Sequence, residues 1–110
     1  MITVQILRGE DGRIRSFKVE GHAGYADPGQ DIVCAGVSSI TVGTVNSVEA
    51  LTGIVMETRM KGGFLSANLP KSADESASGQ VQLLLESMVV MLQGIADSYG
   101  KYIRIQELTT

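Results

Sequence analysis

An apolar stripe near the C-terminal end of this 110-residue chain constrains its fold more than any other feature. Between Val81 and Tyr99, apolar residues recur at spacings of three and four positions, which is the period of one face of an α-helix. The stripe is formed by Val81, Leu84, Leu85, Met88, Leu92, Ile95, Ala96 and Tyr99. A helix of this kind buries its apolar face against another layer of secondary structure, which the rest of the chain must supply.

Five shorter segments have the pattern of β-strands and supply that layer. The predicted strands cover residues 2–8, 13–20, 54–61, 64–69 and 102–108. The turn Glu10–Gly12 joins the first two strands, and Gly62-Gly63 joins the third and fourth, so each pair is predicted to form a hairpin. Residues 70–76 are polar and are predicted to be a linker.

A second helix is predicted from the N-cap residue Asp31 to about Thr52, with Gly53 ending it. Its many Val, Ile and Thr residues favour a strand by propensity, but a segment of about twenty residues without a turn signal is too long for one here. Length therefore favours the helix. The residues expected on its buried face are Val33, Val37, Ile40, Val48 and Leu51.

The order strand, strand, helix, strand, strand, helix, strand predicts an α+β fold of two layers. We expect a twisted, mostly antiparallel sheet with both helices on one face. The length of the chain fits a single domain over residues 1–110.

Composition argues against several classes of protein. Nine basic and twelve acidic residues give a net charge of -3, without a run of Lys or Arg, so direct nucleic-acid binding is not expected. One cysteine and one histidine cannot form an intramolecular disulfide or a four-ligand zinc site, and no metal or cofactor is expected. The longest apolar run, Met88–Leu92, is far shorter than a membrane span. We expect a soluble, cytoplasmic protein without a membrane partner.

The single imidazole and the single thiol lie on either side of a glycine-rich loop. His22 follows a predicted strand and Cys34 falls in the first turn of a predicted helix, so a loop that folds back can bring them together. A helix start stabilises a thiolate by only about 0.3 to 1 kcal/mol. The nearby carboxylate of Asp31 would oppose it by about 3 kcal/mol at an effective dielectric constant of about 20. Protonated His22 is the candidate cation that reverses this balance.

Other interpretations of these residues remain open. A free cysteine on an apolar helix is often a small buried core residue, and a histidine after a strand often bonds its own loop. Asp31 is interpreted first as a helix cap, with orientation of His22 as the alternative. Ser38, one turn after Cys34, can assist the site or simply be tolerated within the helix.

The loop itself contains three glycines and a Pro-Gly pair, and it is longer than a simple connection needs. Gly21, Gly24 and Gly29 are candidate hinges. They suit ordinary turns, and they also suit a lid that responds to substrate.

Two segments of the chain resemble the signature of the Prp-type ribosomal-processing cysteine proteases of Firmicutes and related bacteria. The first is Gly-His-Ala at residues 21–23, and the second runs from Gly29 through Asp-Ile-Val-Cys-Ala-Gly-Val-Ser at residues 31–38. Size and element order agree from Met1 to about Leu108, although the second half agrees by pattern only.

The resemblance implies a cytoplasmic endopeptidase that removes a short N-terminal extension from a large-subunit ribosomal protein. It also implies a homodimer, a cysteine nucleophile at Cys34, a histidine partner at His22 and a mobile loop at residues 23–33. Asp31 and Ser38 match motif positions as candidates for a supporting part. In such a mechanism, backbone N–H groups near the helix start hold the oxyanion, and that of Cys34 is one candidate.

Two other functions remain as alternatives. The domain can be a binding module that docks on ribosomal protein or RNA without cutting, in which case Cys34 is merely packed. A redox thiol protein is the weaker alternative, because the chain has no second cysteine to resolve an oxidised thiol.

Overall fold

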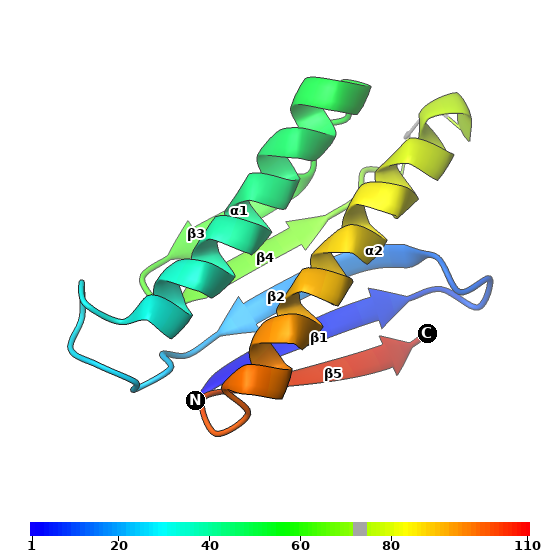
Figure 1. Cartoon of the computed structure of the whole chain (residues 1–110). Helices are drawn as coiled ribbons and strands as arrows, with labels where there is room; N and C mark the ends of the chain where they lie inside the picture. Colours follow the sequence, from blue (N-terminus) through cyan, green and yellow to red (C-terminus); the bar gives the residue numbers. More distant parts are fainter. Residues whose placement is uncertain (72–74) are drawn as a thin grey trace.

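The computed structural model describes residues 1–71 and 75–110 of the chain. Over these residues, strands and helices follow in the predicted order (Figure 1). The elements are β1 (Ile2–Arg8), β2 (Ile14–Glu20), α1 (Ile32–Thr52), β3 (Glu57–Lys61), β4 (Phe64–Asn68), α2 (Glu75–Ser98) and β5 (Ile103–Thr109). Residues 72–74 of the predicted linker lie outside the described residues, and α2 already begins at Glu75.

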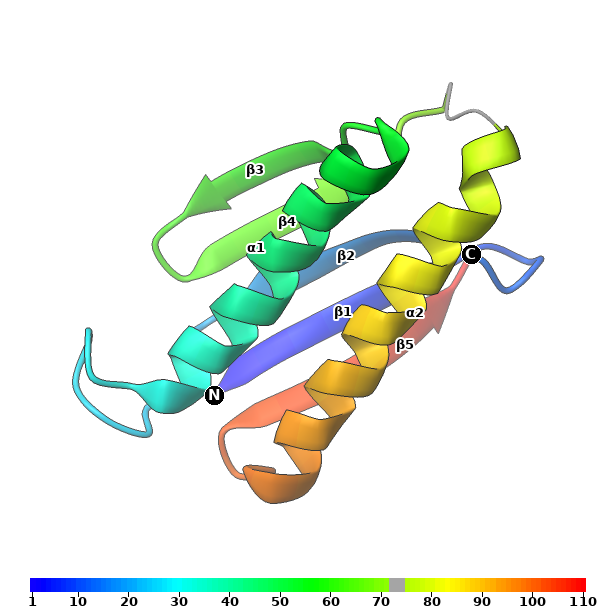
Figure 2. The ribbon, with the colours of Figure 1, turned by 45° about the horizontal axis from the view of Figure 1, so that its top comes forward.

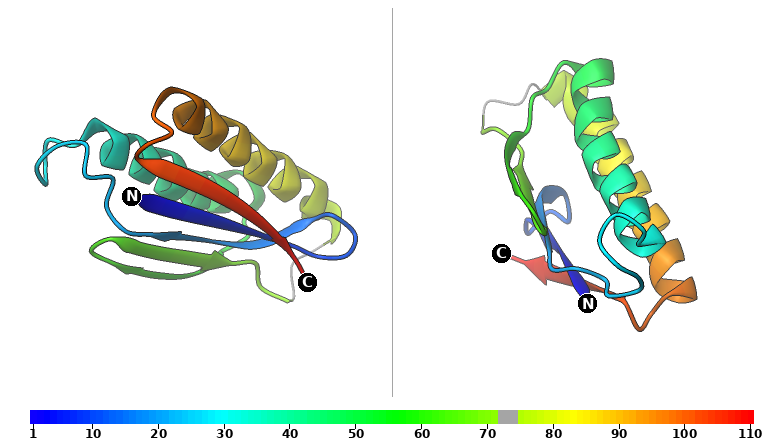
Figure 3. Two further views of the ribbon diagram at one scale, coloured as in Figure 1. Left: turned by 90° about the horizontal axis from the view of Figure 1, so that it is seen from below. Right: turned by 90° about the vertical axis from the view of Figure 1, so that its left-hand side faces the viewer.

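The strands form one mixed sheet in the order β3-β4-β2-β1-β5. Three neighbouring pairs are antiparallel, and β1 and β5 pair in parallel. Both helices lie side by side over the same face of the sheet (Figures 2 and 3). This arrangement confirms the predicted two-layer α+β fold with a mostly antiparallel sheet.

The core lies between the sheet and the helices. β1 contributes Ile2, Val4 and Ile6, which alternate along the strand with half-buried polar residues, as the sequence pattern predicts. The C-terminal stripe contributes four fully buried residues of α2, namely Val81, Leu85, Met88 and Leu92. Burying each such side chain stabilises the fold by about 1.5 to 3 kcal/mol. The other members of the predicted stripe are half-buried at its borders.

The buried face of α1 differs from the prediction at its C-terminal end. Leu51 is 70% exposed, so its predicted place in the core is wrong. The stripe instead passes through Thr41 and Thr44, whose hydroxyl groups donate hydrogen bonds to the carbonyl oxygens of Val37 and Ile40 at 2.8 and 2.6 Å. Because these bonds satisfy the hydroxyl groups within the helix, threonine can occupy buried positions here.

The third strand is shorter than predicted, and it is exposed along its whole length. β3 begins at Glu57, three residues after the predicted start, and every residue of β3 is exposed, including Met60 at 66%. β3 lies at the edge of the sheet and hydrogen-bonds only to β4. An edge strand needs no apolar residues on both faces, so its alternation does not indicate burial.

Two helical stretches, α1 and Ser78–Ser98 of α2, are long and apolar enough to cross a membrane when judged by length and composition alone. The core helix of a folded domain passes the same criterion. Both stretches belong to helices that pack a buried stripe onto the sheet, which accounts for their apolar composition.

Candidate active site

The carboxylate of Asp31 connects the glycine-rich loop to the start of α1. Oδ1 accepts hydrogen bonds from the N–H groups of Val33 and Cys34 at 3.0 and 3.1 Å, which confirms Asp31 as the N-cap. Oδ2 accepts from the N–H groups of Tyr25 and Ala26 at 2.9 and 3.2 Å. Asp31 is only 8% exposed, so one buried side chain fixes both the helix start and the middle of the loop.

The electrostatic environment keeps the Asp31 carboxyl ionised. Burial acts to raise its pKa, but hydrogen bonds from the backbone N–H groups of Cys34, Ala26, Tyr25 and Val33 together outweigh burial and hold the pKa below its ordinary value. The four donors use both oxygens. Among the described residues, no hydrogen bond joins Asp31 to His22, so the alternative role of Asp31 in orienting His22 by a direct bond has no support in this geometry.

Close backbone contacts place His22 at the end of β2. Gly21 has a φ of 92°, and its N–H donates a hydrogen bond to the carbonyl oxygen of Gly63 at 2.9 Å. A Cβ atom at Gly21 would collide with the carbonyl oxygen of Met1. A glycine is therefore needed here both for its positive φ and for lack of space, and it directs the chain toward the β3–β4 turn at residues 62–63.

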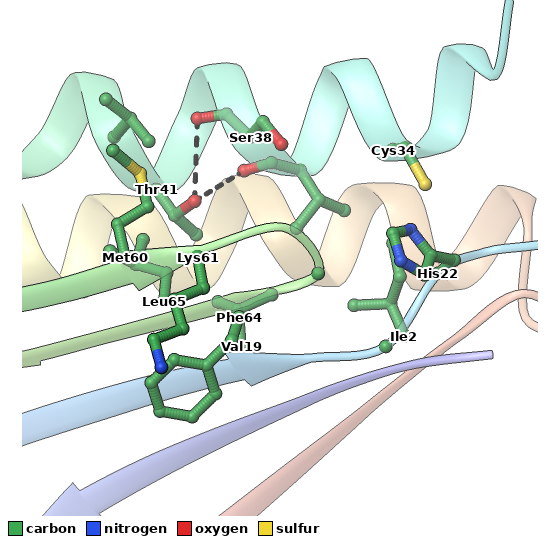
Figure 4. A pocket seen from close by; sticks show the side chains of 14 residues that line it. Ile2, Val19, His22, Cys34, Ser38, Thr41, Met60, Lys61, Phe64 and Leu65 are labelled. Carbon is green, nitrogen blue, oxygen red and sulfur yellow. Dashed lines mark hydrogen bonds between the residues drawn. The ribbon is translucent and has the colours of Figure 1, made fainter. Parts of the chain in front are cut away.

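Cys34, in the first turn of α1, and His22, which follows the end of β2, lie next to each other. Cys34 is a free, half-buried thiol, and its Sγ accepts a hydrogen bond from the N–H of Ala23 at 3.3 Å. His22 is exposed, and Figure 4 shows the sulfur of Cys34 directed toward its imidazole. The structure therefore brings together the two residues that the sequence places on either side of the loop. A donor aimed at the sulfur also stabilises negative charge on it.

Two hollows meet at this pair. The first, of about 190 Å³, lies between α1 and the β3–β4 hairpin (Figure 4). Its walls include Val37, Val42 and Leu65. The second, of about 580 Å³, lies on the side of the glycine-rich loop. His22 and Cys34 line both hollows, so a ligand in either one reaches the sulfur.

The remaining predicted residues lie near the pair without bonding to it. Ser38 is exposed and lines both hollows, but no side-chain hydrogen bond joins it to Cys34 or His22 in the described part of the chain. Gly24 and Gly29 have φ values of 72° and 85° and open space around their Cα atoms. Their backbone conformation, rather than a close contact, favours glycine at these two loop positions.

Two residues that sequence reasoning did not assign to the site are part of its surroundings. Tyr25 packs edge-to-face against Tyr99 and Tyr102, with ring centroids 5.7 and 5.2 Å apart. Gly63 lies directly against the His22 ring. Both contacts join distant parts of the chain, and the only local signal was the Gly-Gly pair, which we interpreted as a simple hairpin turn.

Among the side chains that the structure describes, at residues 1–71 and 78–110, no three His, Cys, Asp or Glu converge to hold a metal ion. The chemistry available at the site is that of a thiol beside an imidazole, at a helix start with two adjoining hollows. A thiol of this kind acts as a nucleophile toward acyl groups when the imidazole accepts the thiol proton.

Comparison with known proteins defines the class: the chain is a hydrolase of the cysteine protease type. The family described as cysteine protease Prp matches residues 1–104, and the chain belongs to this family. It is 39% identical over 107 residues to the ribosomal processing cysteine protease Prp of Bacillus subtilis, covering 96% of each chain. It is 34% identical over 108 residues to the protein of the same name from Staphylococcus aureus, covering 96% of this chain and 97% of that one.

Solved structures agree with this assignment. Prp from Staphylococcus aureus in complex with a covalently linked product peptide matches with a TM-score of 0.88 at 32% identity, covering 97% of this chain and 99% of that chain. The same protease in complex with a substrate peptide matches with a TM-score of 0.82 at 30% identity and the same coverage.

Proposed function

We propose that this chain is a cytoplasmic endopeptidase that removes the N-terminal extension of a large-subunit ribosomal protein, with Cys34 as nucleophile and His22 as its proton-transfer partner. The observation that carries the proposal is the sulfur of Cys34 directed at the imidazole of His22, at the junction of two hollows. The names of the relatives from Bacillus subtilis and Staphylococcus aureus, ribosomal processing cysteine protease, support the kind of substrate.

In the proposed mechanism, the thiolate of Cys34 attacks the scissile carbonyl carbon and forms a tetrahedral intermediate. Protonated His22 then gives its proton to the leaving amine as the C–N bond breaks and the acyl-enzyme forms. Next, neutral His22 takes a proton from water, which attacks the thioester; the C–S bond then breaks and releases the product acid, leaving the thiolate of Cys34 beside protonated His22. Without His22, neither protonation of the leaving amine nor activation of the water would be catalysed.

The oxyanion contact is assigned differently from the sequence expectation. The N–H of Cys34 already donates to Asp31, so it is not free to bind an oxyanion in this state. The N–H of Ala23 donates a hydrogen bond of 3.3 Å to the reacting sulfur. When negative charge passes from the sulfur to the substrate oxygen, this N–H can donate to that oxygen instead. We therefore assign Ala23 as the backbone donor for the oxyanion.

The two hollows suit a peptide that passes the sulfur in an extended conformation. The first hollow has apolar walls from Val42 and Leu65 and accommodates an apolar side chain next to the scissile bond. The second is larger and borders the loop from Gly24 to Gly29, so a substrate that fills it contacts the loop. The Staphylococcus aureus relative was solved with peptide ligands of both kinds, substrate and covalent product, which supports a peptide substrate here.

The protein is also proposed to act as a homodimer. Leu83 and Val90 of α2 are 72% and 71% exposed, and Met91 beside them is 45% exposed. Next to them, a shallow hollow between α1 and α2 is lined by small residues of α1. An exposed apolar surface of this kind is typical of an interface, and a second copy of the chain is the partner that we propose for it.

The proposal is tested by incubating the purified protein with the ribosomal protein that carries its extension. The wild type should make one cut, whereas Cys34→Ala and His22→Ala should make none within a time in which the wild type is complete. Ser98→Ala is a control, because Ser98 is exposed at the end of α2 and lines neither hollow. Complete cleavage by the Cys34→Ala protein would overturn the proposed function, whereas no cleavage by the wild type would favour a binding module.

A further inference from the structure

The His22 imidazole lies against the backbone of the β3–β4 turn. A Cβ atom built on Gly63 would lie 2.7 Å from Nε2, 3.1 Å from Cε1 and 3.3 Å from Cδ2 of His22. The first of these distances is shorter than a Cβ atom can normally approach another atom. One edge of the imidazole therefore fills the space that any side chain at position 63 would need.

Gly63 also holds the backbone that leads into His22. Its carbonyl oxygen accepts the N–H of Gly21 at 2.9 Å, one residue before the histidine. Gly63 thus lies against the ring of His22 and also holds the residue that precedes it. Gly63 itself has a φ of 73°, a left-handed conformation that favours glycine at this position.

Side chains do not account for the orientation of the ring. Asp31, the carboxylate nearest in sequence to the nucleophile, uses both oxygens on backbone N–H groups. Among the described residues, no side chain forms a hydrogen bond to the imidazole of His22. In many hydrolases, a third residue holds the catalytic imidazole by such a bond.

We propose that Gly63 is the positioning residue of His22, an inference that rests on the proposed function. The glycine packs against one edge of the ring, so it limits rotation of the imidazole and keeps it directed at Cys34. A displacement of about 1 Å at a reacting group can lower a rate by roughly a hundredfold, so a single methyl group at position 63 should be enough to disturb the pair.

A matched glycine exists at the opposite end of the sheet. Gly12, in the β1–β2 turn, has a φ of 81°, close to that of Gly63, and nothing lies within 4 Å of the Cβ position at Gly12. Gly63→Ala and Gly12→Ala therefore introduce similar backbone strain into two hairpin turns. Only the first introduces a contact with His22.

The experiment measures three quantities for both variants: the kcat of cleavage, the rate of Cys34 alkylation and the proton resonance of His22. A purely structural role of Gly63 would not change the last two. We expect Gly63→Ala to lower kcat by at least roughly tenfold. It should also slow alkylation of Cys34 by iodoacetamide at about pH 6 and shift the Cε1–H proton resonance of His22, which is the only histidine in the chain. Gly12→Ala should retain the wild-type kcat, alkylation rate and resonance.

A second pair of variants covers the case in which alanine at position 63 prevents folding. Asparagine tolerates left-handed backbone better than alanine, yet its Cβ would meet the same ring atoms. Gly63→Asn should therefore fold and still show the lower kcat and the shifted resonance. Gly12→Asn should also fold, but with the kcat and the resonance of the wild type.

The outcomes separate this inference from the proposed function. A wild-type kcat and an unchanged His22 resonance in folded Gly63→Ala or Gly63→Asn protein would overturn the positioning role alone. An equal loss of kcat in the Gly12 variants would assign the effect to backbone strain and would also overturn it. Complete cleavage by Cys34→Ala would instead overturn the proposed function itself.

Discussion

The N–H of Ala23 donates a hydrogen bond to Sγ of Cys34 at 3.3 Å, across a loop of ten intervening residues. This bond joins the residue after His22 directly to the thiol in the first turn of α1. A single hydrogen bond therefore connects the segment after β2 to the start of α1.

Asp31 should contribute more to stability near neutral pH than in acid. Because its folded pKa is lowered below the unfolded value of about 3.9, its contribution is present above about pH 4 and is lost as pH falls through the lowered folded value. Asp31→Asn should therefore lower Tm at pH 7 and lower it by less at pH 3. Thermal unfolding followed by circular dichroism at both pH values measures this.

The control for this prediction is Asp27→Asn. Asp27 is exposed in the same loop, and its backbone carbonyl, not its carboxylate, accepts the N–H of Gln30. This variant should leave the pH dependence of Tm unchanged. If Asp31→Asn lowered Tm equally at both pH values, the assigned ionisation of Asp31 would be wrong.

Tyr25 should determine how firmly the glycine-rich loop is held. Its ring packs edge-to-face on Tyr99 and Tyr102, and each such pair stabilises by about 0.5 to 1.5 kcal/mol beyond area burial. Tyr25→Ala should therefore speed amide hydrogen exchange in residues 24–30 by about tenfold or more, with little change in α2. Tyr25→Phe keeps the ring and should exchange like the wild type. Unchanged loop exchange in Tyr25→Ala would contradict the anchoring role.

Arg8 should link three elements at the end of the sheet away from the site. Its guanidinium donates two hydrogen bonds of 2.8 Å to Glu86 on α2 and two of 2.9 and 3.3 Å to Glu107 on β5. The bonds from Arg8 hold the pKa of Glu86 below its ordinary value. Because both carboxylates are about half exposed, Glu86→Gln should lower the free energy of unfolding by only about 0.2 to 1 kcal/mol.

This ion-pair effect should decrease at high salt, because exposed charges are screened. Urea unfolding of Glu86→Gln at low salt and at about 1 M salt measures it. The exposed Glu49 on α1 offers a control, and Glu49→Gln should unfold like the wild type under both conditions. Cleavage should not change in either variant. A destabilisation by Glu86→Gln that does not depend on salt would argue against an electrostatic origin.

Much of the fold was predictable because local periodicity reports burial. The stripe that includes Leu85 and Met88 lies on the sheet as expected, and the predicted ends of β2, β4 and β5 are within one residue of those observed. Prediction failed where burial depends on the position of an element in the layer. Leu51 was expected on the buried face of α1, but it lies in the last turn of the helix and is exposed.

The site was predictable only along the chain. His22 and Cys34 lie on either side of a single glycine-rich loop, so their closeness in the sequence indicates that they can meet in the fold. The contact of Gly63 with His22 joins residues from different hairpin and strand segments, and no local pattern reports it. The same holds for Tyr25, whose partners follow α2 near the other end of the chain. Asp31 was predicted as a cap, but its second oxygen also holds the loop.

The central claim is that the imidazole of His22 makes Cys34 a reactive nucleophile. The most direct measurement is the rate at which a peptidyl chloromethyl ketone with the sequence of the substrate extension alkylates Cys34 at about pH 6 in the wild type and in His22→Gln. The account predicts that the wild-type protein reacts much faster than free cysteine, and that the variant loses this advantage. Equal rates for wild type and variant would contradict it.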